Sequence, residues 1–521
     1  MTHDLFGKLF RYTVLFLILT ELISLLTYII PPLNQVAFFI IIIAVLIITL
    51  IKLEYGLYLL LAELFIGGHG YLFSLNINGT SISIRIGIFL IVLAVWLAQK
   101  IKGINRRACS AHLFRSKLWG IVPFLAPRLG NKKSTTFCFT RSTSPIKKAK
   151  FKLSIDKKLF IGLAFLFLFI AAGIINGLIR NEFSNVFFDF NAWIYFALVF
   201  VFIDVARDKK IVENILQILT GSTSYLALKT IGVLFLFSHH IAGIGGFFYK
   251  WIRDTGVGEI TYISGTLFRI FFQSHLYSLI GFLIILTILV SDFKSKNYKH
   301  YIAPVIYLYL TSLAIIISQS RSFWVGGITA LIILLFVAGW RFNFLLKKIL
   351  ILLIVLIIMF ANQIFFIKIL TNNFSGNLIS DRFKNLQTEA ASVSRLNQLQ
   401  PLTYNIFQQI IFGYGFGKEL TYQSNDPRIL KTHPGGVYTT YAFEWGYLDI
   451  WLKIGALGLL AYIFLIYQIA TISLKSKKPI YIGFGVGLIA LVFTNIFSPY
   501  LNHPLGIGYL LLMSAIISDL D

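Results

Sequence analysis

The chain has 521 residues, of which 57% are hydrophobic and 13% are charged, and its formal net charge is +25. Soluble globular domains carry about a quarter charged residues, so this composition excludes a soluble globular protein. Lipid offers the backbone no hydrogen-bond partners, and a spanning segment therefore needs about 20 mostly apolar residues in helical form. The sequence predicts a polytopic membrane protein.

Apolar runs of this length recur along the sequence and predict an all-α fold of about fourteen transmembrane helices. The runs lie near residues 11–30, 35–51, 55–74, 83–99, 158–178, 190–205, 222–242, 270–290, 301–318, 324–339, 348–369, 447–470, 479–497 and 504–518. The expected organisation is N-terminal transmembrane helices over 1–99, a basic cytoplasmic loop over 100–157, central helices over 158–369, one large extracytoplasmic loop over 370–446, and C-terminal helices over 447–521.

The distribution of short-loop Lys and Arg predicts the orientation. Lys8 and Arg11 precede the first run, and later basic clusters such as RDKK at 207–210 and KSKK at 475–478 fall on the same side when the runs are counted. Basic residues favour the cytoplasmic side of a membrane. Both termini are therefore expected in the cytoplasm, and the large loop is expected to face outward.

The loop over 100–157 carries much of the net charge. Sixteen Lys or Arg and one Asp (Asp156) lie between Lys100 and Lys158. Contact with anionic membrane lipids is one interpretation, and a cytoplasmic insertion that only fixes the topology is the favoured one. The charges are not part of a recognisable nucleic-acid-binding fold. The only two cysteines, Cys109 and Cys138, lie in this loop, so neither a disulfide framework nor a structural metal is expected.

The large loop at 370–446 is too long to be only a connection. Loops of more than about 12–15 residues are uncommon in compact domains and are often functional. Within it, Leu402, Ile406, Ile410 and Ile411 are spaced to share one face of a helix, with Pro401 suited to its first turn. This pattern predicts an amphipathic helix on the membrane surface.

Three arginines are predicted near the outer face. Arg269 stands at the outer end of the run at 270–290, Arg321 stands in the turn between the next two runs, and Arg395 stands in the large loop. Any one of them could simply extend to the lipid head groups. Three on one side fit an anion site better, because a guanidinium stays charged and binds phosphate oxygens in a bidentate manner.

Several short motifs occur in a fixed order around these arginines. They are an SxSR turn followed by an aromatic residue and glycine (Ser318, Ser320, Arg321, Phe323, Trp324, Gly326), SRL (Ser394, Arg395, Leu396), GxGxG (Gly413, Gly415, Gly417), and YL followed by glycines (Tyr447, Leu448, Gly455, Gly458). In this order the chain resembles the O-antigen ligase and polymerase superfamily over about residues 260–470.

The resemblance implies a fold similar to the GT-C class and a metal-independent membrane glycosyltransferase without a cofactor, in a bacterial cytoplasmic (inner) membrane. Its partners would be a glycan donor linked to undecaprenyl diphosphate, a glycan, lipid or protein acceptor, and membrane lipids. Arg269, Arg321 and Arg395 would hold the diphosphate and stabilise the charge that develops on it. A base would deprotonate the attacking hydroxyl, and the anomeric carbon would invert.

The residue that acts as base is where the sequence departs from the family pattern. Ligase-like members carry a loop histidine about three residues before the YL pair, whereas this chain has Glu444 there and His433 farther upstream. A carboxylate close to arginines is a weak base, while a histidine near positive charge stays neutral and accepts a proton. His433 is therefore the favoured base, with Glu444 orienting the acceptor or pairing with an arginine.

Other polar residues are assigned with alternatives. Gln273 and His275 lie about one helical turn from Arg269 and are expected to extend its site. Gly413 and Gly415 would either bring backbone N–H groups to phosphate or sugar, or only let the loop turn, and Tyr447 is expected beside the substrate. His239 and His240 could face the cavity but are expected to be helix packing partners. His503 is expected to be a loop residue.

Two rival functions are weighed against the transferase. A lipid-linked oligosaccharide flippase or other transporter would show repeat symmetry and ionisable residues near the bilayer midplane. A metal-dependent GT-C enzyme would need an acidic pair in the first outer loop, but that loop is the short PPLN, and the Asp-x-Asp at 519–521 is at the cytoplasmic end. Polar groups concentrated at the outer face favour the transferase.

Overall fold

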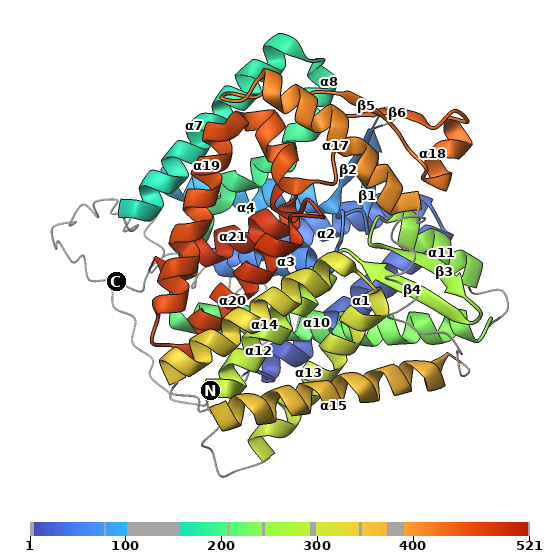
Figure 1. Ribbon diagram of the computed structural model, residues 1–521, viewed down its shortest axis with the longest axis vertical. Helices are drawn as coiled ribbons and strands as arrows, with labels where there is room; N and C mark the ends of the chain where they lie inside the picture. The colour runs from blue at the N-terminus through green and yellow to red at the C-terminus, as the bar shows by residue number, and fades with distance from the viewer. Residues whose placement is uncertain are drawn as a thin grey trace, which may run out of the picture.

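The computed structural model describes residues 5–77, 80–101, 157–206, 208–241, 245–291, 299–342, 346–371 and 390–518. These residues are mostly helical (Figure 1). Nearly all of the predicted basic loop, residues 372–389 of the large loop and the Asp-x-Asp at the C-terminus lie outside them.

The elements fall into two halves of the chain. The first half contains α1 (Lys8–Ile29), α2 (Pro32–Ile51), α3 (Leu53–Ile66), β1 (Ser74–Ile77), β2 (Thr80–Ser83), α4 (Ile84–Ile101), α7 (Lys157–Arg180), α8 (Phe183–Phe190), η2 (Trp193–Leu198), α9 (Val199–Val205), α10 (Lys209–Ser238) and α11 (Gly245–Asp254). The second contains β3 (Gly258–Ser264), β4 (Leu267–Phe272), α12 (His275–Ser291), α13 (Lys299–Ser318), α14 (Arg321–Phe342), α15 (Leu346–Leu370), α17 (Ala390–Gln408), β5 (Leu420–Gln423), α18 (Pro427–Thr432), β6 (Val437–Thr440), α19 (Gly446–Lys475), α20 (Pro479–Thr494), η3 (Tyr500–Asn502) and α21 (Pro504–Ile517).

The helices agree with a polytopic membrane protein. In the described part of the chain, nine helices are long and apolar enough to cross a bilayer, or ten if the bent pair α8 and η2–α9 forms one span. Three shorter apolar helices, α12, α20 and α21, accompany them. The structure thus supports the all-α membrane class, while the predicted count of fourteen spans is not confirmed.

The central helices pack around α12. This helix is buried along nearly its whole length and contacts α10, α13, α14 and α20. On the other side of the molecule, α19 packs along α7 (Figure 1). By contrast α15 has almost no buried surface, as expected of a helix whose sides face lipid tails.

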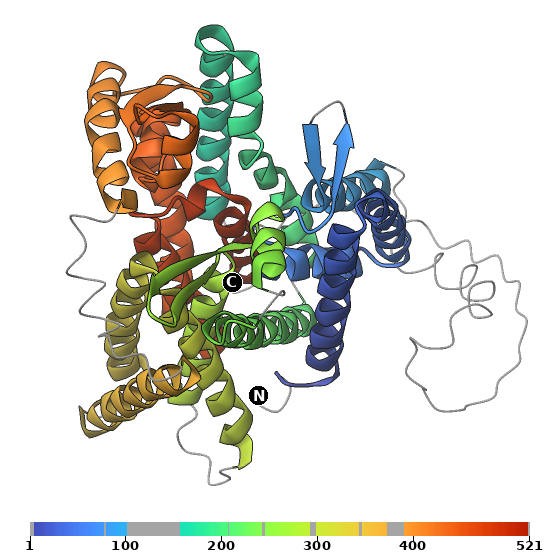
Figure 2. The ribbon, with the colours of Figure 1, turned by 90° about the vertical axis from the view of Figure 1, so that its right-hand side faces the viewer.

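The predicted helix at 270–290 is wrong at its start. Leu267–Phe272 forms strand β4, which pairs antiparallel with β3 and places Thr261 opposite Arg269. The helix α12 begins only at His275. The physical reason is that a short apolar run such as LFRIFF suits either a buried helix or a strand, and the neighbouring segment 258–264 supplies a pairing partner. The hairpin lies between α11 and α13 (Figure 2).

The predicted surface helix starting at Pro401 is also wrong in its details. Pro401 lies inside α17, which begins eleven residues earlier. Leu402 and Ile406 are buried in a small apolar cluster, but Ile410 and Ile411 follow the end of the helix and are exposed. The helix packs on α19 and β5, so protein contacts rather than the lipid surface determine which residues it buries.

A buried network of charges joins α8, α19 and the segments that carry Gly417 and Asn502. The Lys453 ammonium on α19 lies 2.6 Å from Asp189 Oδ1 on α8 and 2.9 Å from Asp449 Oδ2. The Gly417 N–H donates to Asp189 over 2.8 Å, and Asn502 Nδ2 donates to Asp449. Lys453 is one cation between two carboxylates. The Gly417 and Asn502 donors help to stabilise the negative charge that it does not neutralise.

We predict that Lys453→Met destabilises the protein by about 3–5 kcal/mol, because it leaves two buried carboxylates without their cation. The measurement is unfolding of the purified protein in detergent. Lys477→Met is the matched control, since Lys477 is exposed. Equal stability of the two variants would contradict the prediction.

Candidate functional site

Arg269 is held at the turn between α13 and α14. From β4, its Nε donates a hydrogen bond of 2.9 Å to the carbonyl of Ser318, the last residue of α13. The guanidinium also lies 4.8 Å from the centre of the Phe271 ring, which stacks on Phe323 of α14. Because residues two apart on a strand share a face, Arg269 and Phe271 together cover this turn.

Arg321 is the first residue of α14 and follows a strained turn. Gln319 has φ 47°, in the left-handed region that non-glycine residues rarely adopt. This conformation reverses the chain within two residues and brings Arg321 to the helix N-terminus, where the helix dipole also favours an anion. The Arg321 Nη1 donates to Ser392 Oγ over 2.9 Å.

Arg395 lies one turn beyond Ser392 on α17 and pairs with Glu444. Its Nε donates to Glu444 Oε2. The backbone around both residues is fixed, because the Trp445 indole donates to the Arg395 carbonyl over 2.8 Å and the Glu444 N–H donates to Gln398. Both charged side chains remain about 40% exposed, so this ion pair orients Arg395 more than it stabilises the fold.

Tyr500 packs against the start of α14. Its ring lies 5.7 Å from that of Phe323, two residues after Arg321. Burial raises the pKa of Tyr500 above its ordinary value, and the positive charges of Arg269 and Arg395 act in the opposite direction. Arg269 bonds to Ser318, three residues before Arg321, and Arg321 bonds to Ser392, three residues before Arg395. These hydrogen bonds link the three segments, one strand and two helices, that carry the predicted arginines.

His275 and Gln273 do not extend this region as neighbours on one helix. His275 is fully buried at the start of α12, where its Nε2 lies 2.8 Å from Thr230 Oγ1 and its Nδ1 accepts from the Phe272 N–H. Its contacts fix the strand-to-helix junction. Gln273 points elsewhere, toward the ring of His69. The predicted spacing fails because Arg269 is on a strand.

The GYGFG segment packs against a break in α19. Gly455 has φ 71° and ψ 178° and interrupts this helix. The Tyr414 and Gly415 N–H groups donate to the carbonyls of Leu452 and Lys453, which the break leaves without helical donors. Gly413 and Gly415 also have positive φ. Since the Gly415 N–H is bonded to protein, the geometry favours the turning role of these glycines over the binding of phosphate or sugar.

Tyr447 and His433 lie outside the arginine region in their described contacts. The Tyr447 hydroxyl donates to the Val492 carbonyl on α20. His433 is exposed just after α18, and its ring contacts Thr432 and Tyr438. Figure 1 shows α18 and the strands β5 and β6 extending beyond α17. The catalytic roles of His433 and Glu444 remain predictions.

Sequence reasoning missed Tyr500 and His69. Tyr500 belongs to PYLNHP, and nothing in the neighbouring sequence signals an arginine site. The buried group of Asp189, Asp449 and Lys453 was missed too, although charges inside apolar runs are a usable signal. In the described ranges, no three or more His, Cys, Asp or Glu residues are grouped to hold a metal ion.

The fold and these contacts define a multi-pass membrane protein with a cationic site at one end of its bundle. Residues 306–463 match the family described as O-Antigen ligase, and this match supports membership of the O-antigen ligase and polymerase superfamily. No curated protein and no solved structure matches the chain.

The matched residues run from α13 into α19 and include Arg321, Arg395, His433 and Glu444. The match supports ligase-like or polymerase-like activity in general, and so a membrane glycosyltransferase in the broad sense. The family acts with lipid-linked glycan donors and glycan acceptors, and with the apolar helices it supports a multi-pass protein of the bacterial inner membrane. The match gives no support to the transporter alternative.

We predict that Gly415→Ala destabilises the protein by about 2 kcal/mol or more, because its Cβ would lie 2.1 Å from the Gly177 nitrogen and its φ is +87°. Unfolding in detergent measures the change. Gly435→Ala is the control, since no atom lies within 4 Å of a Cβ there. A Gly415→Ala variant as stable as Gly435→Ala would rule out the close approach of Gly415 to Gly177.

Proposed function

We propose that the protein transfers a glycan from undecaprenyl diphosphate to an acceptor hydroxyl at the outer face of the bacterial cytoplasmic membrane, without a metal ion. The observation that supports the proposal is that the Arg269–Ser318 and Arg321–Ser392 hydrogen bonds link the segments that carry Arg269, Arg321 and Arg395. The diphosphate is already an activated leaving group. Three guanidinium groups supply the positive charge that stabilises it as the glycosidic bond breaks.

The half-burial of the arginines suits this role. Each keeps part of its surface accessible while protein covers the rest. Charge interactions at such a place are stronger than in bulk water. The Ser318 carbonyl and the Ser392 hydroxyl fix Arg269 and Arg321 before a ligand binds, so little reorganisation is needed when phosphate arrives.

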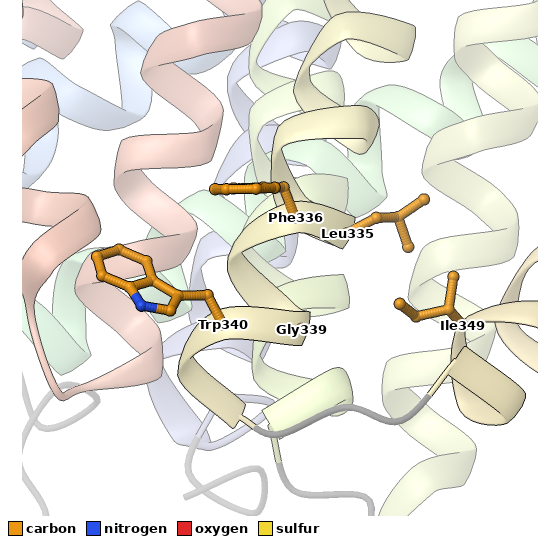
Figure 3. A pocket seen from close by; sticks show the side chains of 5 residues that line it. All are labelled: Leu335, Phe336, Gly339, Trp340 and Ile349. Carbon is orange, nitrogen blue, oxygen red and sulfur yellow. The ribbon is translucent and has the colours of Figure 1, made fainter.

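An apolar path along α14 suits the lipid part of the donor. Starting one turn after Arg321, exposed apolar side chains recur every three or four residues, at Val325, Ile328, Ile332, Phe336 and Trp340. The path reaches an apolar pocket of about 600 Å³ between α14 and α15. Leu335 and Ile349 face each other across it (Figure 3). A polyprenyl chain along this path would leave its diphosphate at the arginines.

The proton is accepted by His433 in this proposal, while Glu444 holds Arg395. The ion pair with Arg395 supports this division, because a carboxylate beside a guanidinium binds a proton weakly. The acceptor hydroxyl would then bind between the arginines and the loop that follows α18. Inversion of the anomeric carbon follows from a single displacement.

Arg321→Ala is expected to lower the transfer rate about 10²–10³-fold, the usual cost of removing one group that stabilises developing charge. The transfer rate of Arg321→Lys should lie between those of the wild type and Arg321→Ala, because lysine keeps the charge without the planar fork. The assay uses proteoliposomes, an undecaprenyl-diphosphate-linked glycan and EDTA. Arg180→Ala, at an exposed arginine, is the control. Full activity of Arg321→Ala, or loss of wild-type activity in EDTA, would refute the corresponding part of the proposal.

His433→Ala is expected to lower kcat about 10²–10⁴-fold, as for other general bases, and Glu444→Gln should change it much less, since the amide oxygen still accepts from Arg395. His239→Ala is the control at a histidine outside the site. Full activity of His433→Ala together with loss in Glu444→Gln would reverse the assignment.

A further inference from the structure

A second polar cluster, outside the arginine site, is built from three distant parts of the chain. His69 follows α3, Gln273 follows β4, and His503 precedes α21. His69 Nδ1 lies 3.4 Å from His503 Nε2, and the Gln273 amide contacts His69 Nε2. The Tyr500 hydroxyl donates to the Gln273 carbonyl over 3.1 Å, so this cluster adjoins Tyr500.

The loop that carries His69 is fixed in place. The Gly68 N–H donates to Ser274 Oγ, and Arg85, which is paired with Glu63, donates to the Gly68 carbonyl over 2.7 Å. The His69 N–H donates to the Gly256 carbonyl. The His69 side chain is nevertheless accessible to solvent although protein surrounds it on most sides. Hydrogen bonds hold its loop while its ring stays exposed.

Both imidazoles are neutral at neutral pH. Burial and the nearby Arg85 together lower the pKa of His69 to about 4, against an opposing contribution from Glu259. Burial, with His69 and Arg85, also lowers the pKa of His503. The Leu505 N–H donates to His503 Nδ1, which places the proton of a neutral ring on its Nε2, facing His69. Neutral rings add no charge to the cluster, which suits hydroxyl groups better than phosphate.

The cluster and the arginine site lie along one hairpin. Arg269 and Phe271 share one face of β4, and Glu259 stands opposite Phe271 on β3. Gln273 follows the end of β4, where its N–H donates to the Val257 carbonyl. Four residues of chain span at most about 14 Å, which limits the distance from Gln273 to Arg269. This separation suits a diphosphate and the sugar bonded to it.

We infer that His69, Gln273 and Glu259, with His503 positioning His69, form a subsite for the hydroxyl groups of the sugar bonded to the donor diphosphate. A carboxylate, an amide and a neutral imidazole beside an aromatic ring supply the acceptors, donors and flat apolar surface that a sugar ring needs. All four residues lie outside the matched range 306–463. The inference rests on the proposed function and adds which residues select the glycan.

The test compares the binding of two probes to the purified protein in lipid nanodiscs. One probe is undecaprenyl diphosphate, and the other is undecaprenyl diphosphate carrying a glycan, extracted from cells that make the protein. The wild type should bind the second probe at least about tenfold more tightly. His69→Ala and Gln273→Ala should remove about tenfold of affinity for the glycan-bearing probe only, and His69→Asn should restore part of it.

The controls separate the two claims. Arg321→Ala should weaken both probes, and His239→Ala should weaken neither. Failure of the wild type to bind either probe would refute the proposed function. Binding of both probes with equal affinity by the wild type would overturn the subsite, and so would a full glycan preference in His69→Ala and Gln273→Ala. Equal weakening of both probes in these variants would also overturn it.

Discussion

A single buried ammonium, that of Lys453, joins four segments that are far apart in the sequence. Its two carboxylate partners come from α8 and from the first turn of α19, and each accepts a further hydrogen bond from another segment. One of those donors belongs to the glycine segment and the other, Asn502, directly precedes His503. Because a buried charge must be neutralised and hydrogen-bonded, these four segments have little freedom to move independently.

The membrane class could be predicted from the sequence because apolar runs must become helices in lipid. The runs at 11–30 and 348–369, for example, correspond to α1 and α15. The prediction failed where lipid no longer decides the structure. LFRIFF pairs with another strand, and Pro401 is tolerated within α17 because the following turn packs on α19. Such choices depend on a partner that is remote in sequence.

The arginine region could be predicted from the sequence only in part. Counting spans put Arg269, Arg321 and Arg395 on one side, and charge chemistry suggested why they would meet. No local sequence signal indicates that Tyr500 packs on Phe323 or that His69 contacts His503, 434 positions away. The role expected of His275 failed with the helix on which it depended. The glycine motif was ambiguous until its N–H groups had partners.

The apolar stripe on α14 has a consequence for a donor of any length. Because it begins beside Arg321 and faces the lipid, a carrier would approach sideways through the bilayer, with its tail never leaving the hydrocarbon. The attached polymer would remain in the water outside throughout. Under the proposed function, the enzyme would therefore need no tunnel wide enough for the sugar chain, and polymer size would place no steric limit on entry.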